Sequence, residues 1–262
     1  MGLGTHRRPC LTGRYIVLET LVRLGFDLKF TFHADAILSN HFPDALAELD
    51  KIIGNTCIPI TEIIGGGGGE ARVTQRLRHS LSDHGWLKTI FNVEKRINDD
   101  VTYATSHEVD HVKTFASGTI ALEIEWNNKD PFFDRDLENF NRLHADGAIS
   151  LGIIITRGRS LQDNIEDLIA RYAMESGIKS PKDLERLDIV RTRRQSDALE
   201  KRTARSDRPF PEVWAALFKA DKFGAATTHW AKLEDRLDRG VGNPCPFVAI
   251  GLPISIVDVT LT

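Results

Sequence analysis

Residues 120–129 read IALEIEWNNK, an apolar run in which two acids stand at alternate positions. Alternate side chains of a β-strand point to opposite faces of the sheet. The branched apolar residues therefore share one face, which we expect to lie in the core, while Glu123, Glu125 and Asn127 share the other. Two carboxylates placed side by side repel each other and lose hydration, which is unfavourable unless a cation or a substrate offsets it.

A third acid, Asp110, lies on the strand expected before this one. With Glu123 it offers a few hard oxygen ligands, which suit Mg2+ held jointly with a phosphate. The pattern indicates a phosphodiester-cleaving metal site, and surface charge on a half-exposed strand is the alternative. In the metal-site interpretation Asp110 and Glu123 bind Mg2+ together with the peptide carbonyl between the two glutamates. Glu125 then orients or deprotonates the attacking water, at a position where many enzymes of this chemistry carry lysine.

The three residues that leave this strand, Asn127, Asn128 and Lys129, stand where a loop next to such a site would meet DNA. Asn bonds adenine bidentately, and Lys contacts guanine or phosphate. An ordinary polar strand end is the alternative interpretation.

A basic stretch runs from Arg186 to Arg208, with eight Arg or Lys against four Asp or Glu in a chain of net charge −3. This local excess favours a groove that holds a phosphate backbone and argues against a protein that coats nucleic acid over its whole surface. Within the stretch Arg193, Arg194 and Arg202 are candidates for contacts with the DNA backbone, and a solvated helix face is the alternative.

The periodicities around the acidic strand predict the fold class. Val109–Phe115 and Thr119–Trp126 form a predicted hairpin around Gly118. A helix from Phe133 to His144 then returns the chain, and the β-branched run Ile149–Thr156 predicts a strand covered on both faces. Strands joined by such a crossover are parallel. We therefore expect an α/β fold with a mixed central β-sheet flanked by helices.

Weaker patterns predict the remaining elements. A pair of short helices is expected on either side of Phe42, and the glycines of 65–69 predict a loop because ordering glycine loses the most backbone entropy. The other expected helices are Arg14–Leu24, Ala71–Leu81, Pro211–Ala220 and one capped by Ser160, and the other expected strands are Leu87–Ile97, Phe247–Leu252 and Ile254–Leu261.

Composition bounds the class of protein. The chain has 262 residues, 41% of them hydrophobic, and we expect a single domain over residues 1–262. It contains no apolar run long enough to cross a membrane and no secretory leader pattern, so a cytoplasmic protein with no membrane partner is expected. Three widely spaced cysteines, Cys10, Cys57 and Cys245, favour free thiols over a disulfide framework or a zinc site.

Several segments together resemble a known family. Over about His33 to Tyr172, the order and spacing of these segments are similar to those of the BglII-like type II restriction endonucleases, relatives of BamHI within the PD-(D/E)xK nuclease superfamily. The segments that carry the resemblance are His33–Leu38, Trp86, Val109-Asp110, Leu122–Glu125, Asn128, Pro131-Phe132 and Ile153–Gly158.

The resemblance implies a PD-(D/E)xK restriction-endonuclease-like fold and a homodimer that encloses double-stranded DNA and cuts both strands of a palindrome with Mg2+ as cofactor. It also implies that Asp110 and Glu123 are the metal-binding acids, and it places Glu125 where BamHI-type enzymes have Glu and BglII-type enzymes have Gln. Members of this branch often read sites that contain GATC. A cognate DNA methyltransferase that protects the host genome is expected with such an enzyme.

Other residue roles follow from the same resemblance. Asn127 and Asn128 fall where family members read bases. A helix residue shortly after the tryptophan joins the site in relatives, and here Thr89 is the nearest match while Glu94 is the nearest acid. We expect a catalytic core at about residues 85–175 and DNA contacts from residues 176–262.

Two other functions fit parts of the pattern. A structure-selective or repair nuclease of the same superfamily uses the same acids without reading sequence. A non-catalytic DNA-binding domain retains the basic residues and carries Asp110 and Glu123 only as surface charges.

Overall fold

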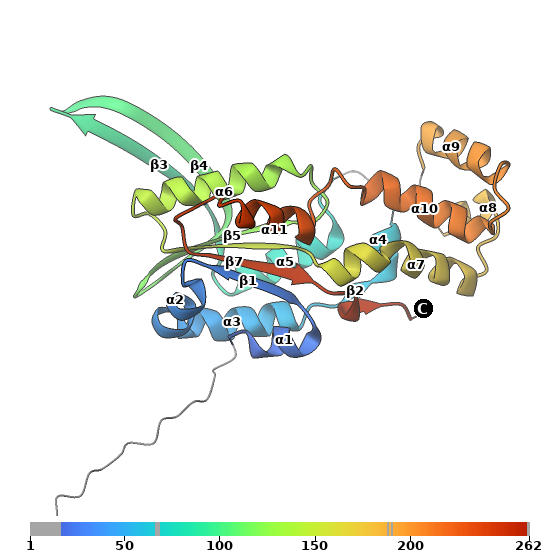
Figure 1. Cartoon of the computed structure of the whole chain (residues 1–262), viewed down its shortest axis with the longest axis horizontal. Coiled ribbons are helices and arrows are strands. Elements are labelled where there is room, and N and C mark those ends of the chain that lie inside the picture. Colours follow the sequence, from blue (N-terminus) through green and yellow to red (C-terminus); the bar gives the residue numbers. More distant parts are fainter. Residues whose placement is uncertain (1–16, 66–68, 188, 190, 261–262) are drawn as a thin grey trace, which may run out of the picture.

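The computed structural model describes residues 17–65, 69–187, 189 and 191–260, and its centre is a six-stranded sheet (Figure 1). The strands are β1 (Asp27–Thr31), β3 (Leu87–Ile97), β4 (Asp100–Phe115), β5 (Gly118–Glu125), β6 (Leu151–Arg157) and β7 (Phe247–Leu252). They lie in the order β1-β7-β6-β5-β4-β3. The β5, β6 and β7 strands run parallel, whereas β1, β4 and β3 run antiparallel to their neighbours. The mixed central sheet, the hairpin around Gly118 and the parallel pair β5–β6 are thus confirmed.

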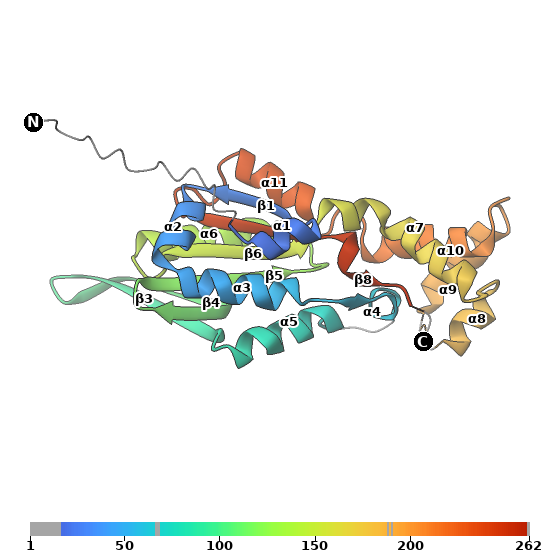
Figure 2. The same ribbon diagram turned by 90° about the horizontal axis from the view of Figure 1, so that it is seen from below.

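Helices cover both faces of this sheet (Figures 1 and 2). One face carries α6 (Pro131–Ala145) and α11 (Trp230–Asp238), and the other carries α1 (Glu19–Leu24), α2 (Ala34–His41), α3 (Pro43–Gly54) and α5 (Arg72–Asp83). At one end of the sheet a helical extension contains α7 (Arg159–Glu175), α8 (Pro181–Arg186), α9 (Arg193–Thr203) and α10 (Phe210–Lys222), and α4 (Ile60–Ile64) contacts α7. Among the described residues no helix combines the length and the apolar character that crossing a membrane requires.

The apolar core lies on both sides of the parallel strands. All residues of β6 and β7 are buried, because helices pack on both of their faces. Such strands read as continuous apolar runs. The β5 strand is also buried from Ile120 to its end, so its two glutamates lie inside the protein rather than on its surface.

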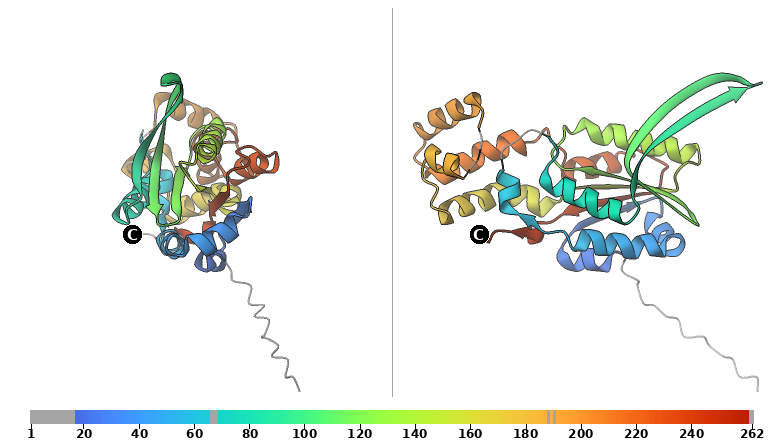
Figure 3. Two further views of the ribbon diagram at one scale, coloured as in Figure 1. Left: turned by 90° about the vertical axis from the view of Figure 1, so that its left-hand side faces the viewer. Right: turned by 180° about the vertical axis from the view of Figure 1, so that it is seen from behind.

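The β3–β4 hairpin extends well beyond the rest of the sheet (Figure 3). The β4–β5 ladder ends at the pair His111–Leu122, whereas β3 and β4 continue together to the pair Ile97–Asp100. The turn contains Asn98 and Asp99, both with positive φ (50° and 67°), as a tight two-residue hairpin turn requires. The sequence prediction started β4 only at Val109, because side chains exposed on both faces leave no apolar alternation farther out.

The ends of three predicted elements differ in the structure. The α7 helix follows Gly158, and Ser160 does not cap it; its Oγ instead accepts the Ile254 N–H (3.1 Å). Of the predicted strand Ile254–Leu261, only β8 (Val257–Asp258) forms a strand in the described residues, and it pairs with β2 (Ile58–Pro59) after a short 3-10 turn at Ile254–Ile256. The helix expected from Arg14 begins at Glu19.

Some predicted features lie outside the described residues. These are the start of the Arg14–Leu24 helix, the loop glycines 66–68, Cys10 and Leu261. The short strand β1 is a miss of the sequence prediction, although Leu28 and Phe30 alternate with polar residues; all five of its residues are half-buried.

Candidate active site

The β5 strand carries Glu123 and Glu125 into the interior beneath α6. Only 7% of Glu123 and 3% of Glu125 is exposed. The strand pairs in parallel with β6, where Glu125 lies opposite Thr156. The Thr156 hydroxyl donates a hydrogen bond to the backbone carbonyl of Glu125 (2.7 Å), which anchors the end of the strand. Both carboxylates are therefore held on a rigid element.

Asp110 lies next to Glu123 across the β4–β5 pair. Its backbone N–H donates to Glu123 Oε1 at 3.2 Å, one residue beyond the last ladder pair. Unlike the glutamates, Asp110 has an exposed side chain. The structure therefore brings Asp110 and Glu123 together, with one carboxylate open to solvent and the other enclosed.

A lysine from β3 approaches the exposed acid. Lys88 Nζ lies 3.3 Å from Asp110 Oδ1 and 2.6 Å from Glu108 Oε1. The hydrogen bonds that Lys88 donates to Glu108 and Asp110 raise the pKa of Lys88, so its ammonium stays charged. Sequence reasoning noted that lysine is missing at position 125 and did not find Lys88, which reaches the site from a different strand.

A fourth acid, Asp136, enters the site from α6 and was missed in the sequence. It is 2% exposed, and its Oδ1 accepts a hydrogen bond from Arg135 Nε at 2.8 Å. Asp136 stands within the apolar stripe of Phe133, Leu137 and Phe140. A charged residue on the buried stripe of a helix is the signal that identifies it.

Burial dominates the electrostatics of these acids. Burial, followed by the charges of Asp136 and Asp110, raises the pKa of Glu123 to about 9. Burial, followed by the charge of Asp136, raises the pKa of Glu125 to about 8. Burial also raises the pKa of Asp136, against the opposing effect of Arg135. Without an added cation, burial and mutual repulsion favour the protonated form of these carboxyl groups.

These residues suit a divalent cation in several respects. Glu123 makes no ion pair within the described part of the chain, and the Oδ2 atom of buried Asp136 has no hydrogen-bond donor there. No group of three or more His, Cys, Asp or Glu side chains among the described residues is arranged to hold a metal. The ligand set of two carboxylates, a backbone carbonyl and a phosphate, as expected from the sequence, does not require such a group. The donors present therefore fit Mg2+ shared with DNA.

Neither of the two residues considered for an additional role joins the carboxylates. Thr89 Oγ1 donates to the Leu87 carbonyl (3.2 Å), and Thr89 pairs with Val109. Glu94 pairs with Ala104 far along the projecting hairpin. Glu94 is excluded from the site by this distance along the strand.

The loop after β5 begins directly after Glu125. Asn128 Nδ2 donates to Glu125 Oε2 at 2.7 Å, so one of the predicted base-reading residues is bonded directly to a predicted catalytic one. Asn127 is half-buried, and Asn128 and Lys129 are exposed.

The predicted backbone clamps lie elsewhere. Arg193 and Arg194 form the first turn of α9, in the helical extension beyond the end of the sheet (Figure 1). Thr192 caps this helix through a capping box with Gln195. Both arginines line a shallow hollow with Asp197, Ala198 and Lys201. The structure therefore does not bring them to the carboxylates.

Comparison with protein families gives one match. The family model described as restriction endonuclease BglII/BglIII matches residues 26–252. The matched range includes the four acids, the loop after β5 and the helical extension. A search among curated proteins gave no match.

Proposed function

The chain belongs to the BglII/BglIII family of type II restriction endonucleases, and on that basis we propose that Asp110, Glu123 and Glu125 form its active site. The enzyme is a site-specific deoxyribonuclease, which hydrolyses phosphodiester bonds in DNA. The observation that best supports this assignment is the enclosed Glu123 carboxylate beside the Asp110 backbone, with no counter-charge of its own among the described residues.

We assign the cofactor Mg2+ to Asp110 and Glu123, with the backbone carbonyl of Ile124 as a third ligand. A bound Mg2+ supplies positive charge at the scissile phosphate and lowers the pKa of a water molecule. The two carboxylates differ in exposure. Asp110 is open to solvent, on the side from which a phosphate would approach, and Glu123 would hold the metal from the buried side. Lys88, which stands beside Asp110, contributes a further positive charge near the phosphate.

Glu125 has the role of orienting or deprotonating the attacking water. Asn128 donates to one of its oxygens, and Arg135 Nη2 lies 3.8 Å from the other. These two donors restrict the rotation of the carboxylate. Asp136 opposes the loss of its proton, and a nearby cation reverses that effect.

DNA recognition is assigned to two regions. Asn127, Asn128 and Lys129 read base edges in the major groove, and Arg193 and Arg194 contact phosphates from the helical extension. The chain then divides into a catalytic core at about residues 85–175 and a later part that contributes DNA contacts.

We also propose the oligomeric state, the target, the companion enzyme and the cellular location. Two copies form a homodimer on a palindromic site, because a two-fold protein places one active site on each strand of a two-fold target. A GATC-containing site, a companion methyltransferase and a cytoplasmic location complete the proposal.

The test is digestion of long unmethylated DNA from several sources by the purified protein, with Mg2+ and with EDTA. Discrete fragments that require Mg2+ support the proposal, and sequencing their ends gives the site. A smear points to a nuclease that does not read sequence. Intact DNA in both lanes contradicts catalysis and favours a binding domain.

A further inference from the structure

The loop that leaves β5 is held by a distant part of the chain. Thr228 N–H donates to the carbonyl of Asn128 at 2.8 Å, and Asp130 N–H donates to the carbonyl of Ala226 at 3.0 Å. The segment 224–228, which joins α10 to α11, thus pairs with the loop along its backbone. We call this segment the brace.

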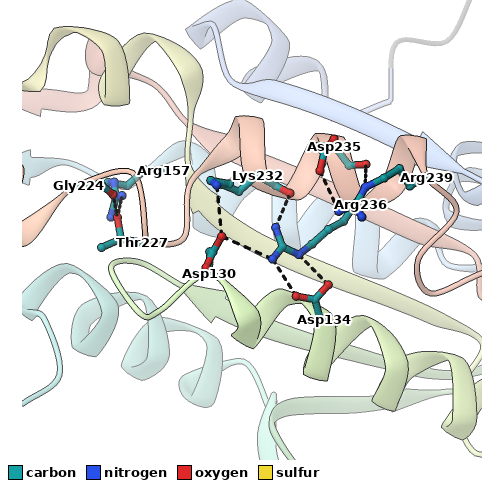
Figure 4. Close-up of polar contacts among 9 residues, drawn as sticks. All are labelled: Asp130, Asp134, Arg157, Gly224, Thr227, Lys232, Asp235, Arg236 and Arg239. Atoms are coloured by element: carbon teal, nitrogen blue, oxygen red, sulfur yellow. Dashed lines mark hydrogen bonds and ion pairs between the residues drawn. The ribbon is translucent and has the colours of Figure 1, made fainter.

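A buried arginine connects the brace to the start of the loop, and Figure 4 shows its contact with the brace. Arg157, the last residue of β6, is 0% exposed. Its Nη1 donates to the Trp126 carbonyl, its Nη2 to Thr227 Oγ1 at 2.8 Å and its Nε to Gln162 Oε1 at 3.0 Å. The Thr227 hydroxyl in turn donates to the Gly224 carbonyl at 2.8 Å. One guanidinium therefore fixes the strand end, the brace and α7 relative to one another.

This arginine is an unfavourable choice if stability alone matters. No carboxylate pairs with it among the described residues, and burial lowers the pKa of Arg157 to about 9. The faces of Trp126 and Phe223 lie 5.7 and 4.8 Å from its guanidinium carbon and offset only part of the lost hydration. Apolar side chains of similar volume often stabilise a core as well as buried charges do. What an apolar residue lacks is a rigid planar fork that bonds several acceptors at set angles.

A second attachment holds the far end of the loop (Figure 4). Arg236 of α11 bonds both oxygens of Asp134 through Nε (2.9 Å) and Nη2 (2.8 Å). Lys232 Nζ lies 3.4 Å from Asp130 Oδ2, at the start of α6. Loop 127–130 is thus attached at its start through Arg157 and at its end through α11.

We propose that Arg157 is a specificity-positioning residue: through Trp126 and Thr227 it sets the position of Asn127–Lys129 relative to the catalytic Glu125. The inference rests on the proposed base reading by this loop. Discrimination between bases depends on hydrogen-bond geometry, and each well-placed bidentate contact contributes about 1–3 kcal/mol. The loop is only a few residues long, so its attachment points determine where its side chains meet DNA.

The chain offers a matched pair of variants. Thr227 and its neighbour Thr228 are both threonines of the brace, but only Thr227 Oγ1 accepts from Arg157. Thr228 is fully buried, and its hydroxyl has no hydrogen-bond partner in the described part of the chain. Thr227→Val removes the bond from the guanidinium and the bond to the Gly224 carbonyl, whereas Thr228→Val makes the same chemical change without removing a hydrogen bond.

The measurement is the ratio of kcat/KM at the recognised site to kcat/KM at a site that differs by one base pair. We expect this ratio to fall about tenfold in Arg157→Gln and a few-fold in Thr227→Val, and to stay unchanged in Thr228→Val. Arg157→Lys keeps the charge without the fork and is expected to lie close to Arg157→Gln. Thermal unfolding of each variant, with the core variant Leu49→Ala of α3 for comparison, separates loss of stability from loss of discrimination.

A different result is expected if Arg157 contributes only to stability. If Thr227→Val and Thr228→Val behave alike, or if Arg157→Gln lowers the melting temperature as Leu49→Ala does without changing the ratio, the inference is wrong. Should Arg157→Gln not fold, the two threonine variants still decide. Asn127→Ala and Lys129→Ala test the base reading itself: unchanged discrimination in both contradicts that proposal, whereas relaxed discrimination there with a normal ratio in Thr227→Val contradicts only the role of Arg157.

Discussion

The acids that β5 and α6 bring together are buried, whereas the arginines at the start of α9 in the helical extension are exposed. Glu123, Glu125 and Asp136 are enclosed and repel one another, whereas Arg193 and Arg194 on α9 point into solvent. Glu123 has no counter-charge among the described residues, which is unfavourable for a buried carboxylate unless a ligand binds there, while exposed arginines are stable without any ligand. Burial of charged groups, rather than their number, therefore marks the site where chemistry is expected.

The largest effect is expected when the charge of the buried Glu123 is removed. We expect Glu123→Gln to lower the cleavage rate by about a thousandfold or more, because the amide is a poor metal ligand. DNA binding measured in Ca2+ or EDTA should stay within a few-fold of wild type. Cleavage within tenfold of wild type contradicts the assignment of Glu123 as a ligand.

The pH dependence of stability is the next largest expected effect. Burial raises the pKa of Glu123 from its ordinary 4.5 to about 9 in the folded protein. Between these values the unfolded chain has released the proton that the folded protein still holds, so stability falls as pH rises. The slope approaches about 1.4 kcal/mol per pH unit, or about 3 °C in melting temperature.

Thermal unfolding of the metal-free protein between pH 5 and pH 8.5 measures this decline. Mg2+ should reduce it, because the cation replaces the proton at Glu123. Glu123→Gln should show a shallower decline than wild type, and equal slopes in the two proteins disagree with the burial argument.

A smaller effect is expected when the exposed arginines at the start of α9 are replaced. We expect the double variant Arg193→Ala/Arg194→Ala to lower the slope of log affinity against log salt concentration by about 2 and to weaken binding at all sequences alike. Discrimination between sites should not change, since phosphate contacts carry no base information. Arg239→Ala removes an exposed arginine that is paired with Asp235, and it serves as the control. An unchanged salt slope in the double variant contradicts the proposed contact between α9 and the DNA phosphates.

The smallest expected effect concerns Asp136. Asp136→Asn removes a negative charge beside Glu125 and so lowers the pKa of Glu125. The acidic limb of the pH–rate profile should move by up to about one unit toward lower pH, with less than a tenfold change in maximal rate. Glu138→Gln, on the exposed side of the same helix, should keep the wild-type profile. A shift toward higher pH contradicts the expected repulsion.

Local periodicity makes part of the proposed site predictable from sequence. Glu123 and Glu125 were identified because acids alternate with apolar residues on one strand, and the strand–helix–strand order gave the parallel pair β5–β6. Lys88 was not predictable, because its approach to Asp110 depends on the β3–β4 register and on an irregularity between Leu87 and Thr89.

The other misses have similar causes. The burial of Asp136 depends on which side α6 turns to the sheet, although its place in an apolar stripe was visible in the sequence. Arg157 ends an apolar strand, and its partners Trp126 and Thr227 are 31 and 70 residues away in the chain. Such long-range contacts leave no local pattern to read.

The projecting β3–β4 hairpin has a consequence for hydrogen exchange. Beyond the pair His111–Leu122 the ribbon is only two strands wide, and a two-stranded ribbon in water is marginally stable. Its amides should exchange within a local opening that leaves the rest of the sheet intact. Asp110 lies where this opening ends. The boundary between exchanging and protected amides therefore lies beside Asp110 and Glu123, the proposed metal-binding carboxylates.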